Sequence, residues 1–224
     1  MLLLVAAVLA VQEVAEFEML DRNVGLKLYD EAGSLVVELG GFVLLEHPEF
    51  ARQIGVLASE WAHAEAELSA YLAALMRTSP ERTFALLAAY RNADSTATAA
   101  LNLAEVTLHG DMLAEFKAVA ARFRKLAKER NEVQHGLWAR KPAYDGVIFR
   151  VKALEYTKLM VRIVQSDDMI AVAETFSASL NDSYSLDRLE ALTRDVRQLT
   201  SDVCSGRLAW QKNCLIAEAL KGAS

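Results

Sequence analysis

One segment sets the interpretation of this sequence, and it reads Glu129-Arg130-Asn131-Glu132-Val133-Gln134-His135-Gly136-Leu137-Trp138. It comes near the end of the most regularly patterned part of the chain, where apolar residues recur in alternating steps of four and three. Those apolar residues are Met112, Phe116, Val119, Phe123, Leu126, Val133 and Leu137. This spacing predicts a helix that packs one face against other helices, in the same chain or in a partner.

Arg130 occupies the one place in this series where an apolar residue is missing. An arginine in an apolar seam is costly unless a carboxylate, carbonyl groups or an anionic ligand meets it. Asn131 and His135 are four positions apart, so a helix would place both side chains on one face. The pattern therefore predicts a cation, an amide and an imidazole close together at the end of this helix.

Arg130-Asn131, followed by three residues and His135, resembles the Arg-x4-6-His motif of HEPN domains, in particular its Arg-Asn form. The resemblance covers the helical layout from Phe50 to Leu137 and a further helix after Ser185, but its specific part is only six residues. It implies an all-helical bundle that forms a homodimer through the helix carrying the motif. Many HEPN domains are metal-independent ribonucleases of toxin–antitoxin or phage-defence systems, and others only bind. The expected partners are therefore RNA and, in a toxin system, a cognate antitoxin.

The three motif residues fit the chemistry of RNA cleavage, in which a 2′-hydroxyl attacks the adjacent phosphate. Such an enzyme needs an acid or base that titrates near neutral pH and a cation for the developing charge. His135 suits the first role because an ordinary histidine has a pKa of about 6.5. Arg130 suits the second, and Asn131 would orient the imidazole or the phosphate. With one histidine per site, acid and base would come from two protomers.

The charge distribution supports an RNA partner, although the whole chain has a net charge of −6. Residues 117–152 contain ten basic and three acidic residues, so this window carries +7 while the rest carries −13. Such a local field can attract phosphate despite an acidic whole. The alternative is that part of the window is an ordinary solvated helix face. We expect RNA contacts from Lys128, Gln134, Arg140 and Lys141.

Structural explanations of the same residues remain open. Arg130 could pair with a glutamate of the preceding apolar helix, for which the candidates are Glu60, Glu65 and Glu67. His135 could cap carbonyl groups at a helix end. The chain would then be a non-catalytic HEPN-like module for dimerisation or for binding nucleic acid or nucleotides. A helical protein unrelated to HEPN domains is the third possibility.

The fold class expected is mainly α, an antiparallel helical bundle with a small antiparallel β insertion. Helices are expected over 50–77, after Ser79-Pro80 and after Ser185, besides the helix of the motif. Strands are expected at 147–151, 159–164 and 171–180, and a hairpin at 26–29 and 34–39 with Asp30-Glu31-Ala32-Gly33 as its turn. These elements divide into an N-terminal segment, 1–48, and a HEPN-like bundle, 49–224, with the β insertion at about 147–180.

Residues 2–11 form an apolar run that is too short to span a bilayer, which needs about 20 residues. Acidic residues follow at once and no basic residues precede it, so a packed helix is favoured over a signal peptide. Cys204 and Cys214 are about 15 Å apart on the expected final helix, too far for a disulfide, which fits a reducing cytoplasm. The sequence contains no metal-ligand spacing or phosphate-binding loop, so neither a metal nor a cofactor is expected.

Overall fold

The protein is described by a computed structural model over residues 25–90 and 92–222, so the helix expected at 2–11 lies outside the described residues. Within them the chain is mainly helical with a small antiparallel sheet, as predicted in outline. The chain divides into two compact units. The sheet unit contains residues 25–51 and 136–185, and the helical unit contains residues 52–135 and 186–222.

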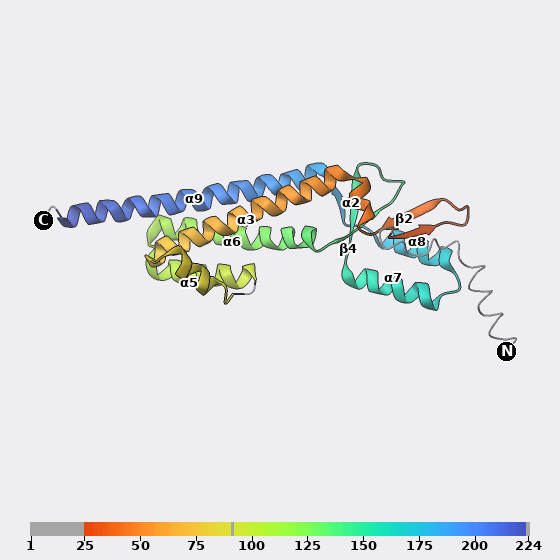
Figure 1. Cartoon of the computed structure of the whole chain (residues 1–224), viewed down its shortest axis with the longest axis horizontal. Helices are drawn as coiled ribbons and strands as arrows, with labels where there is room; N and C mark the ends of the chain where they lie inside the picture. Colours follow the sequence, from red (N-terminus) through yellow and green to blue (C-terminus); the bar gives the residue numbers. More distant parts are fainter. Residues whose placement is uncertain (1–24, 91, 223–224) are drawn as a thin grey trace. The chain divides into compact units, whose positions relative to one another are not determined.

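The strands of the sheet unit follow one another in chain order, each antiparallel to its neighbour (Figure 1). They are β1 (Leu26–Tyr29), β2 (Leu35–Leu39), β3 (Leu137–Arg140), β4 (Val147–Val151) and β5 (Ser183–Ser185). Glu38 of β2 lies opposite Arg140 of β3, 102 positions further along the chain. The hairpin near the N-terminus and the β insertion therefore belong to one sheet.

The hairpin of β1 and β2 forms where the sequence predicts it. The Asp30 carboxylate accepts hydrogen bonds from the backbone N–H groups of Ala32 at 3.0 Å and Ser34 at 2.8 Å. The N–H of Asp30 donates to the Ser34 carbonyl at 2.9 Å, which closes the turn. Gly33 has a φ of +75°, a conformation that glycine adopts without strain. Aspartate and glycine thus supply the local chemistry of this turn.

Two of the three strands predicted for the insertion are wrong, because residues 159–164 and 171–180 lie mostly in helices. These helices are α7 (Ala153–Gln165) and α8 (Met169–Ser179). The Glu155 carboxylate accepts from the N–H of Lys152 at the start of α7, and the Asp168 carboxylate accepts from the N–H of Ala171 at the start of α8. These caps stabilise the first helical turns, and they outweigh the strand preference of the β-branched residues.

The core of the sheet unit lies between the sheet and helices α7 and α8. It buries apolar residues of β1 to β4 against those of both helices: Leu28, Val37, Leu39, Ala139, Phe149, Val151, Leu159, Val172, Ala173, Phe176 and Leu180. A short helix, α2 (Phe42–Glu46), contacts β2 and β3 and buries Phe42 and Val43. Trp138 packs edge-on against Tyr184, with the ring centroids 5.4 Å apart.

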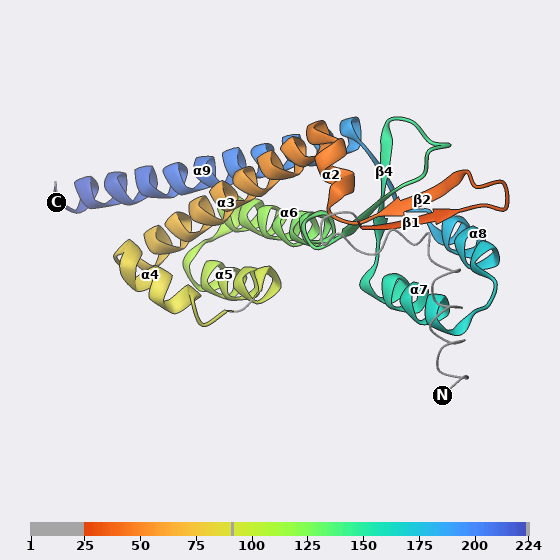
Figure 2. The same ribbon diagram turned by 45° about the vertical axis from the view of Figure 1, so that its right-hand side comes forward.

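The described part of the helical unit contains five helices of very different length, and Figure 2 shows their arrangement within the unit. They are α3 (Pro48–Met76), whose first residues belong to the sheet unit, α4 (Pro80–Leu87), α5 (Ala93–Thr107), α6 (Gly110–Gln134) and α9 (Leu186–Gly222). Ser79 and Asn92 accept hydrogen bonds from backbone N–H groups at the starts of α4 and α5. The helix of the motif begins at Gly110, with His109 at the N-cap.

The core of the helical unit lies between α3, α6 and α9, which run side by side in both views (Figures 1 and 2). Trp61 of α3 packs on Phe123 of α6 with the ring centroids 4.8 Å apart, and Tyr71 meets Phe116 at 5.2 Å. The Gln53 side chain donates to the Thr193 hydroxyl of α9 at 3.0 Å within this core. Among the described residues, no helix is both long and apolar enough to cross a membrane.

Candidate functional site

The motif lies on the last turns of α6, and its surroundings follow from the helical spacing. Phe123, Leu126, Ala127 and Val133 face the core and are buried. Lys128, Asn131 and Gln134 are spaced by three residues, so they share the opposite face, and His135 follows directly; all four are exposed. We refer to Lys128, Asn131, Gln134 and His135 as the polar stripe. Its exposure leaves these side chains open to a partner.

Arg130 lies between the polar stripe and the core, half-buried against α3. The Arg130 Cζ lies 5.8 Å from the centroid of the Trp61 ring, a cation–π contact with a side chain that is 1% exposed. Its Nη1 donates a hydrogen bond to Asn131 Oδ1 at 2.9 Å. Its Nε is buried and has no hydrogen-bond partner within the described part of the chain. Burial lowers the pKa of Arg130, and the charge of Glu65 acts in the opposite direction.

The glutamates proposed as structural partners of Arg130 behave differently from one another. Glu60 pairs with Arg197 at 2.7 Å, and Glu67 pairs with Arg207 at 3.1 Å, so both carboxylates bind arginines of α9. Glu65 is exposed and acts on Arg130 through its charge, and no ion pair joins the two within the ranges that the structure describes. The side-chain partners of Arg130 described above are therefore an aromatic ring and an amide.

His135 is the C-cap of α6, with φ −104° and ψ 8°. Its backbone N–H donates to the Asn131 carbonyl at 3.0 Å, which closes the last helical turn. Its imidazole is exposed and makes no hydrogen bond to Arg130 or Asn131. The structure thus brings the side chains of Arg130 and Asn131 into direct contact and leaves the imidazole of His135 exposed, one turn after Asn131.

Most of the basic residues in the window 117–152 have an acidic partner. The pairs are Lys117–Glu105, Arg122–Asp202, Arg124–Asp94, Lys125–Glu129, Arg140–Glu38 and Arg150–Asp182. The exposed pairs among them, such as Lys117–Glu105 and Lys125–Glu129, are weak and can exchange partners. Lys128 and Arg130 are the cations of α6 in this window for which the described residues show no ion pair. The positive charge next to the motif is therefore smaller than the sequence count suggests.

The two remaining residues predicted to contact RNA belong to the sheet unit. Arg140 donates to the carboxylate of Glu38 at 3.1 Å, and Glu38 is 2% exposed. Lys141 is buried, and its ammonium donates to the carbonyls of Ser177 at 3.2 Å and Leu180 at 3.1 Å. Both cations thus have partners inside the sheet unit, whereas Lys128 and Gln134 lie with the motif on α6.

Trp61 is the member of this site that the sequence did not single out. The pattern of α3 places Trp61 in its apolar stripe, and in the structure the ring also supports a guanidinium. An aromatic residue in such a stripe carries no local signal that a cation will lie over it.

The described residues contain no group of three or more His, Cys, Asp or Glu side chains arranged for a metal ion. Cys204 and Cys214 are free thiols on α9.

Comparison with known proteins adds no relative on which to base a function. No family model matches the chain, and neither the curated proteins nor the solved structures include a significant match. The motif residues and their geometry are therefore the only basis for inferring a function.

Proposed function

We propose that this chain is an RNA endonuclease of the HEPN type that cleaves without a metal ion, with Arg130, Asn131 and His135 at its active site. The observation that carries the proposal is the arrangement at the end of α6. A guanidinium is held against Trp61 and bonded to Asn131, and His135, the C-cap one turn after Asn131, has an exposed imidazole. The Arg-Asn-x3-His spacing that resembles HEPN domains thus coincides with an accessible set of suitable groups.

In this proposal Arg130 stabilises the negative charge that develops on the scissile phosphate. A guanidinium has five N–H donors, and one of those of Arg130 is bonded to Asn131. No carboxylate binds the others within the described residues, and those on Nη1 and Nη2, unlike the buried Nε–H, can turn to phosphate oxygens. Contact with Trp61 and partial burial fix the cation and reduce its hydration, which strengthens its interaction with an anion. Asn131 holds the guanidinium in place and positions the phosphate.

His135 carries out proton transfer. As a base, one imidazole removes the proton of the 2′-hydroxyl, whose oxygen attacks the phosphorus atom. The bond from phosphorus to the 5′-oxygen breaks, and a second imidazole, protonated, gives that oxygen its proton. The products are a 2′,3′-cyclic phosphate and a 5′-hydroxyl. Because each chain has one such histidine, the second imidazole comes from another copy, and the active form is a homodimer through α6.

The RNA backbone would lie along the polar stripe. Lys128 supplies a cation for a neighbouring phosphate and Gln134 supplies an amide, whereas Arg140 and Lys141 are bound to groups of the sheet unit and are left out. The resemblance further suggests a toxin or phage-defence setting with a cognate antitoxin. An RNA substrate and two free cysteines fit the cytoplasm.

The second candidate is a non-catalytic HEPN-like module that pairs through α6 and binds RNA or nucleotides. The observation that favours it is that Arg130 already has two side-chain partners, Trp61 and Asn131, which would also suit a purely structural arginine. The ion pairs of Arg122, Arg124 and Lys125 also favour this candidate, because they reduce the positive charge near the motif that would attract RNA.

Cleavage assays on total RNA and defined tRNAs in EDTA separate the two candidates. We expect wild type to cut and His135→Ala to lose activity by about 100-fold or more, the usual contribution of a general acid or base. His63→Ala, which removes an exposed histidine of α3, is the matched control and should cut like wild type. Circular dichroism checks that each variant is folded. If folded wild type cuts none of these RNAs, the binding module becomes the better account, and if His135→Ala cuts as well as wild type, His135 is not the catalytic acid or base.

A further inference from the structure

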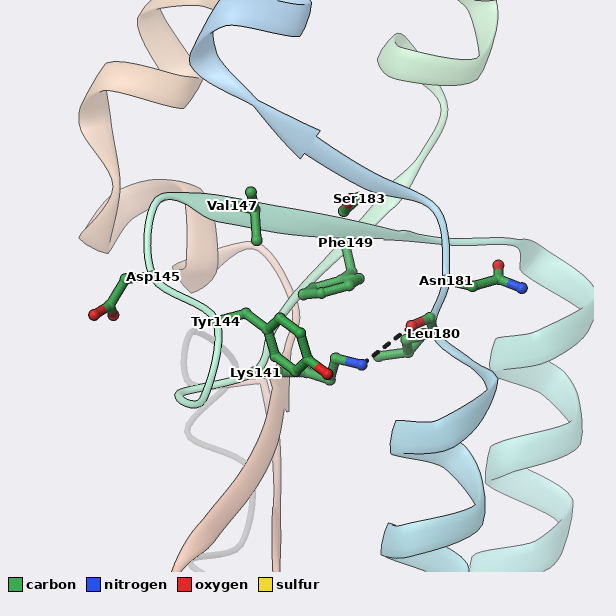
Figure 3. Close-up of a pocket in the computed structure, with 8 residues that line it drawn as sticks. All are labelled: Lys141, Tyr144, Asp145, Val147, Phe149, Leu180, Asn181 and Ser183. Atoms are coloured by element: carbon green, nitrogen blue, oxygen red, sulfur yellow. Dashed lines mark hydrogen bonds between the residues drawn. The ribbon is translucent and has the colours of Figure 1, made fainter.

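The sheet unit contains an open pocket that the proposed ribonuclease site does not use (Figure 3). Its volume is about 570 Å³, within the range of about 300–1,000 Å³ that is usual for small-ligand sites. It is lined by the loop between β3 and β4, by β4, and by the segment that leads from α8 into β5. The lining residues are Lys141, Tyr144, Asp145, Val147, Phe149, Leu180, Asn181 and Ser183.

The wall of this pocket contains a buried cation. Lys141 is 8% exposed, and its Nζ lies 4.6 Å from the centroid of the Tyr144 ring and 4.4 Å from that of Phe149. Two of the three N–H groups of the ammonium donate to the carbonyls of Ser177 and Leu180 at the end of α8. Burial lowers the pKa of Lys141. One donor therefore remains for another acceptor.

This charge has no carboxylate partner among the described residues. The nearest acid in the lining is Asp145, whose carboxylate points away from the Lys141 ammonium (Figure 3). Backbone carbonyls and aromatic rings stabilise a cation without cancelling its charge. The field at this pocket is therefore positive where Lys141 reaches it, and it favours an anionic group.

The rest of the lining offers a flat aromatic surface and neutral polar groups. Tyr144 is 54% exposed, and its ring meets Phe149 edge-on with the centroids 5.7 Å apart. Asn181 is exposed and comes from the segment between α8 and β5, and its side chain points away from Tyr144 and Lys141 (Figure 3). A ligand that is planar at one end and anionic at the other would match both features.

We propose that this pocket binds a nucleoside monophosphate, with the base stacked on Tyr144 and the phosphate bonded to the remaining N–H donor of Lys141. Base stacking on an aromatic side chain tolerates any base, and a charged hydrogen bond to phosphate adds affinity. The nucleotide is either free or the terminal nucleotide of an RNA. The proposal goes beyond the ribonuclease activity and does not require it, because none of the motif residues takes part.

Calorimetric titration of the full chain with adenosine 5′-monophosphate tests the proposal. We expect saturable binding, which Tyr144→Ala weakens about tenfold, the usual effect of losing one stacked base. Tyr29→Ala, which removes another exposed tyrosine of the sheet unit, is the matched control and should bind like wild type. Adenosine and inorganic phosphate are titrated separately, and each should bind at least tenfold more weakly because each lacks one half of the recognition.

The phosphate contact is tested by Lys141→Gln with Lys158→Gln as its control, an exposed lysine of α7. Because Lys141→Gln loses bonds to α8 and could unfold the unit, the salt dependence of binding to wild type provides a second measurement of the charged contact. We expect the affinity for adenosine 5′-monophosphate to fall as salt is added, because salt screens the attraction between phosphate and ammonium, and the affinity for adenosine to stay unchanged. Equal affinity of wild type and Tyr144→Ala would overturn the proposal, as would no binding of the nucleotide by wild type.

A 5′-phosphorylated oligoribonucleotide distinguishes the two sources of the ligand. Tighter binding of the oligonucleotide than of the mononucleotide, again weakened by Tyr144→Ala, assigns the pocket to an RNA end. Affinity for the mononucleotide that equals or exceeds that for the oligonucleotide assigns it to a free nucleotide. These titrations use His135→Ala beside wild type. Nucleotide binding by both, without RNA cleavage by either, would refute the ribonuclease and leave the pocket supported.

Discussion

Arg130 and Lys141 are two cations that this chain buries in similar ways. Arg130 lies over Trp61 and bonds to an amide, and Lys141 lies between two aromatic rings and bonds to two carbonyls. In both cases these contacts offset part of the free energy needed to remove the cation from water, and they leave its charge in place. Each residue therefore keeps a positive charge that can meet an anion, which is why both enter our proposals.

At the residue scale the sequence predicted the site only in part. The sequence singles out Arg130, Asn131 and His135 as candidates because their spacing is local and the helix that carries them is strongly patterned. Contacts between distant residues left no such trace. Nothing in the sequence signals that Trp61 supports Arg130 or that Lys141 caps α8 instead of facing solvent, because these contacts arise only when separate elements pack together.

Tyr71 provides a prediction that depends on pH. Burial, with a smaller contribution from Glu115, raises the pKa of Tyr71 from 10.0 to about 12. Above pH 10 the unfolded chain loses this proton while the folded chain keeps it, so stability should fall between pH 10 and 12. The expected loss is about 2–3 kcal/mol for two pKa units. Urea unfolding should show this extra loss in wild type relative to Tyr71→Phe. Parallel pH profiles for the two proteins would contradict the assignment.

At the scale of single elements, local signals decided which predictions were right. Asp30 and Gly33 encode the turn of the β1–β2 hairpin, and Ser79 with Pro80 encodes the start of α4. Residues 159–164 were predicted as a strand because β-branched residues are dense there. The capping side chains Glu155 and Asp168 lie just outside the expected strands, where a count of strand-forming residues gives them no weight.

Two helical glycines provide a matched test of packing between elements. A Cβ on Gly55 of α3 would meet nothing within 4 Å, whereas a Cβ on Gly206 of α9 would lie 3.1 Å from Cε1 of Tyr71. Gly55→Ala should stabilise the chain by about 0.5–1 kcal/mol, because alanine favours helix over glycine. Gly206→Ala should stabilise the chain less than Gly55→Ala does, or destabilise it, because the Tyr71 ring must shift to make room for the new methyl group. Chemical denaturation measures both, and an equal gain would show that α9 does not pack this closely on α3.

At the scale of the whole molecule, the composition of the two units could not be predicted from the sequence. The sheet unit combines residues 25–51 with 136–185, and the helical unit combines 52–135 with 186–222. Strand pairing across such separations depends on which edges meet, and the pairing of β2 with β3 has no local marker. The predicted division into 1–48 and 49–224 uses continuous segments, because patterns along a single sequence do not reveal which distant segments pack together.

The proposed dimer makes a prediction at this scale. Ala121 is exposed on α6, the helix through which two copies would pair, and Ala66 is exposed on α3. We expect wild type to sediment as a dimer and Ala121→Arg to shift it to monomer, because a large cation would separate the two α6 helices. Ala66→Arg adds the same charge elsewhere in the helical unit and should remain dimeric. A monomeric wild type would remove the basis for sharing acid and base between protomers.

The most direct test of the central claim is cleavage in EDTA of an RNA that wild type cuts, beside the same RNA with a single 2′-deoxy nucleotide at the cleavage site. Our account predicts that wild type leaves a 2′,3′-cyclic phosphate on the first RNA and does not cut the second at that site, and that folded His135→Ala cuts neither. Cleavage of the 2′-deoxy site, or cleavage of the first RNA by His135→Ala at the wild-type rate, would contradict it.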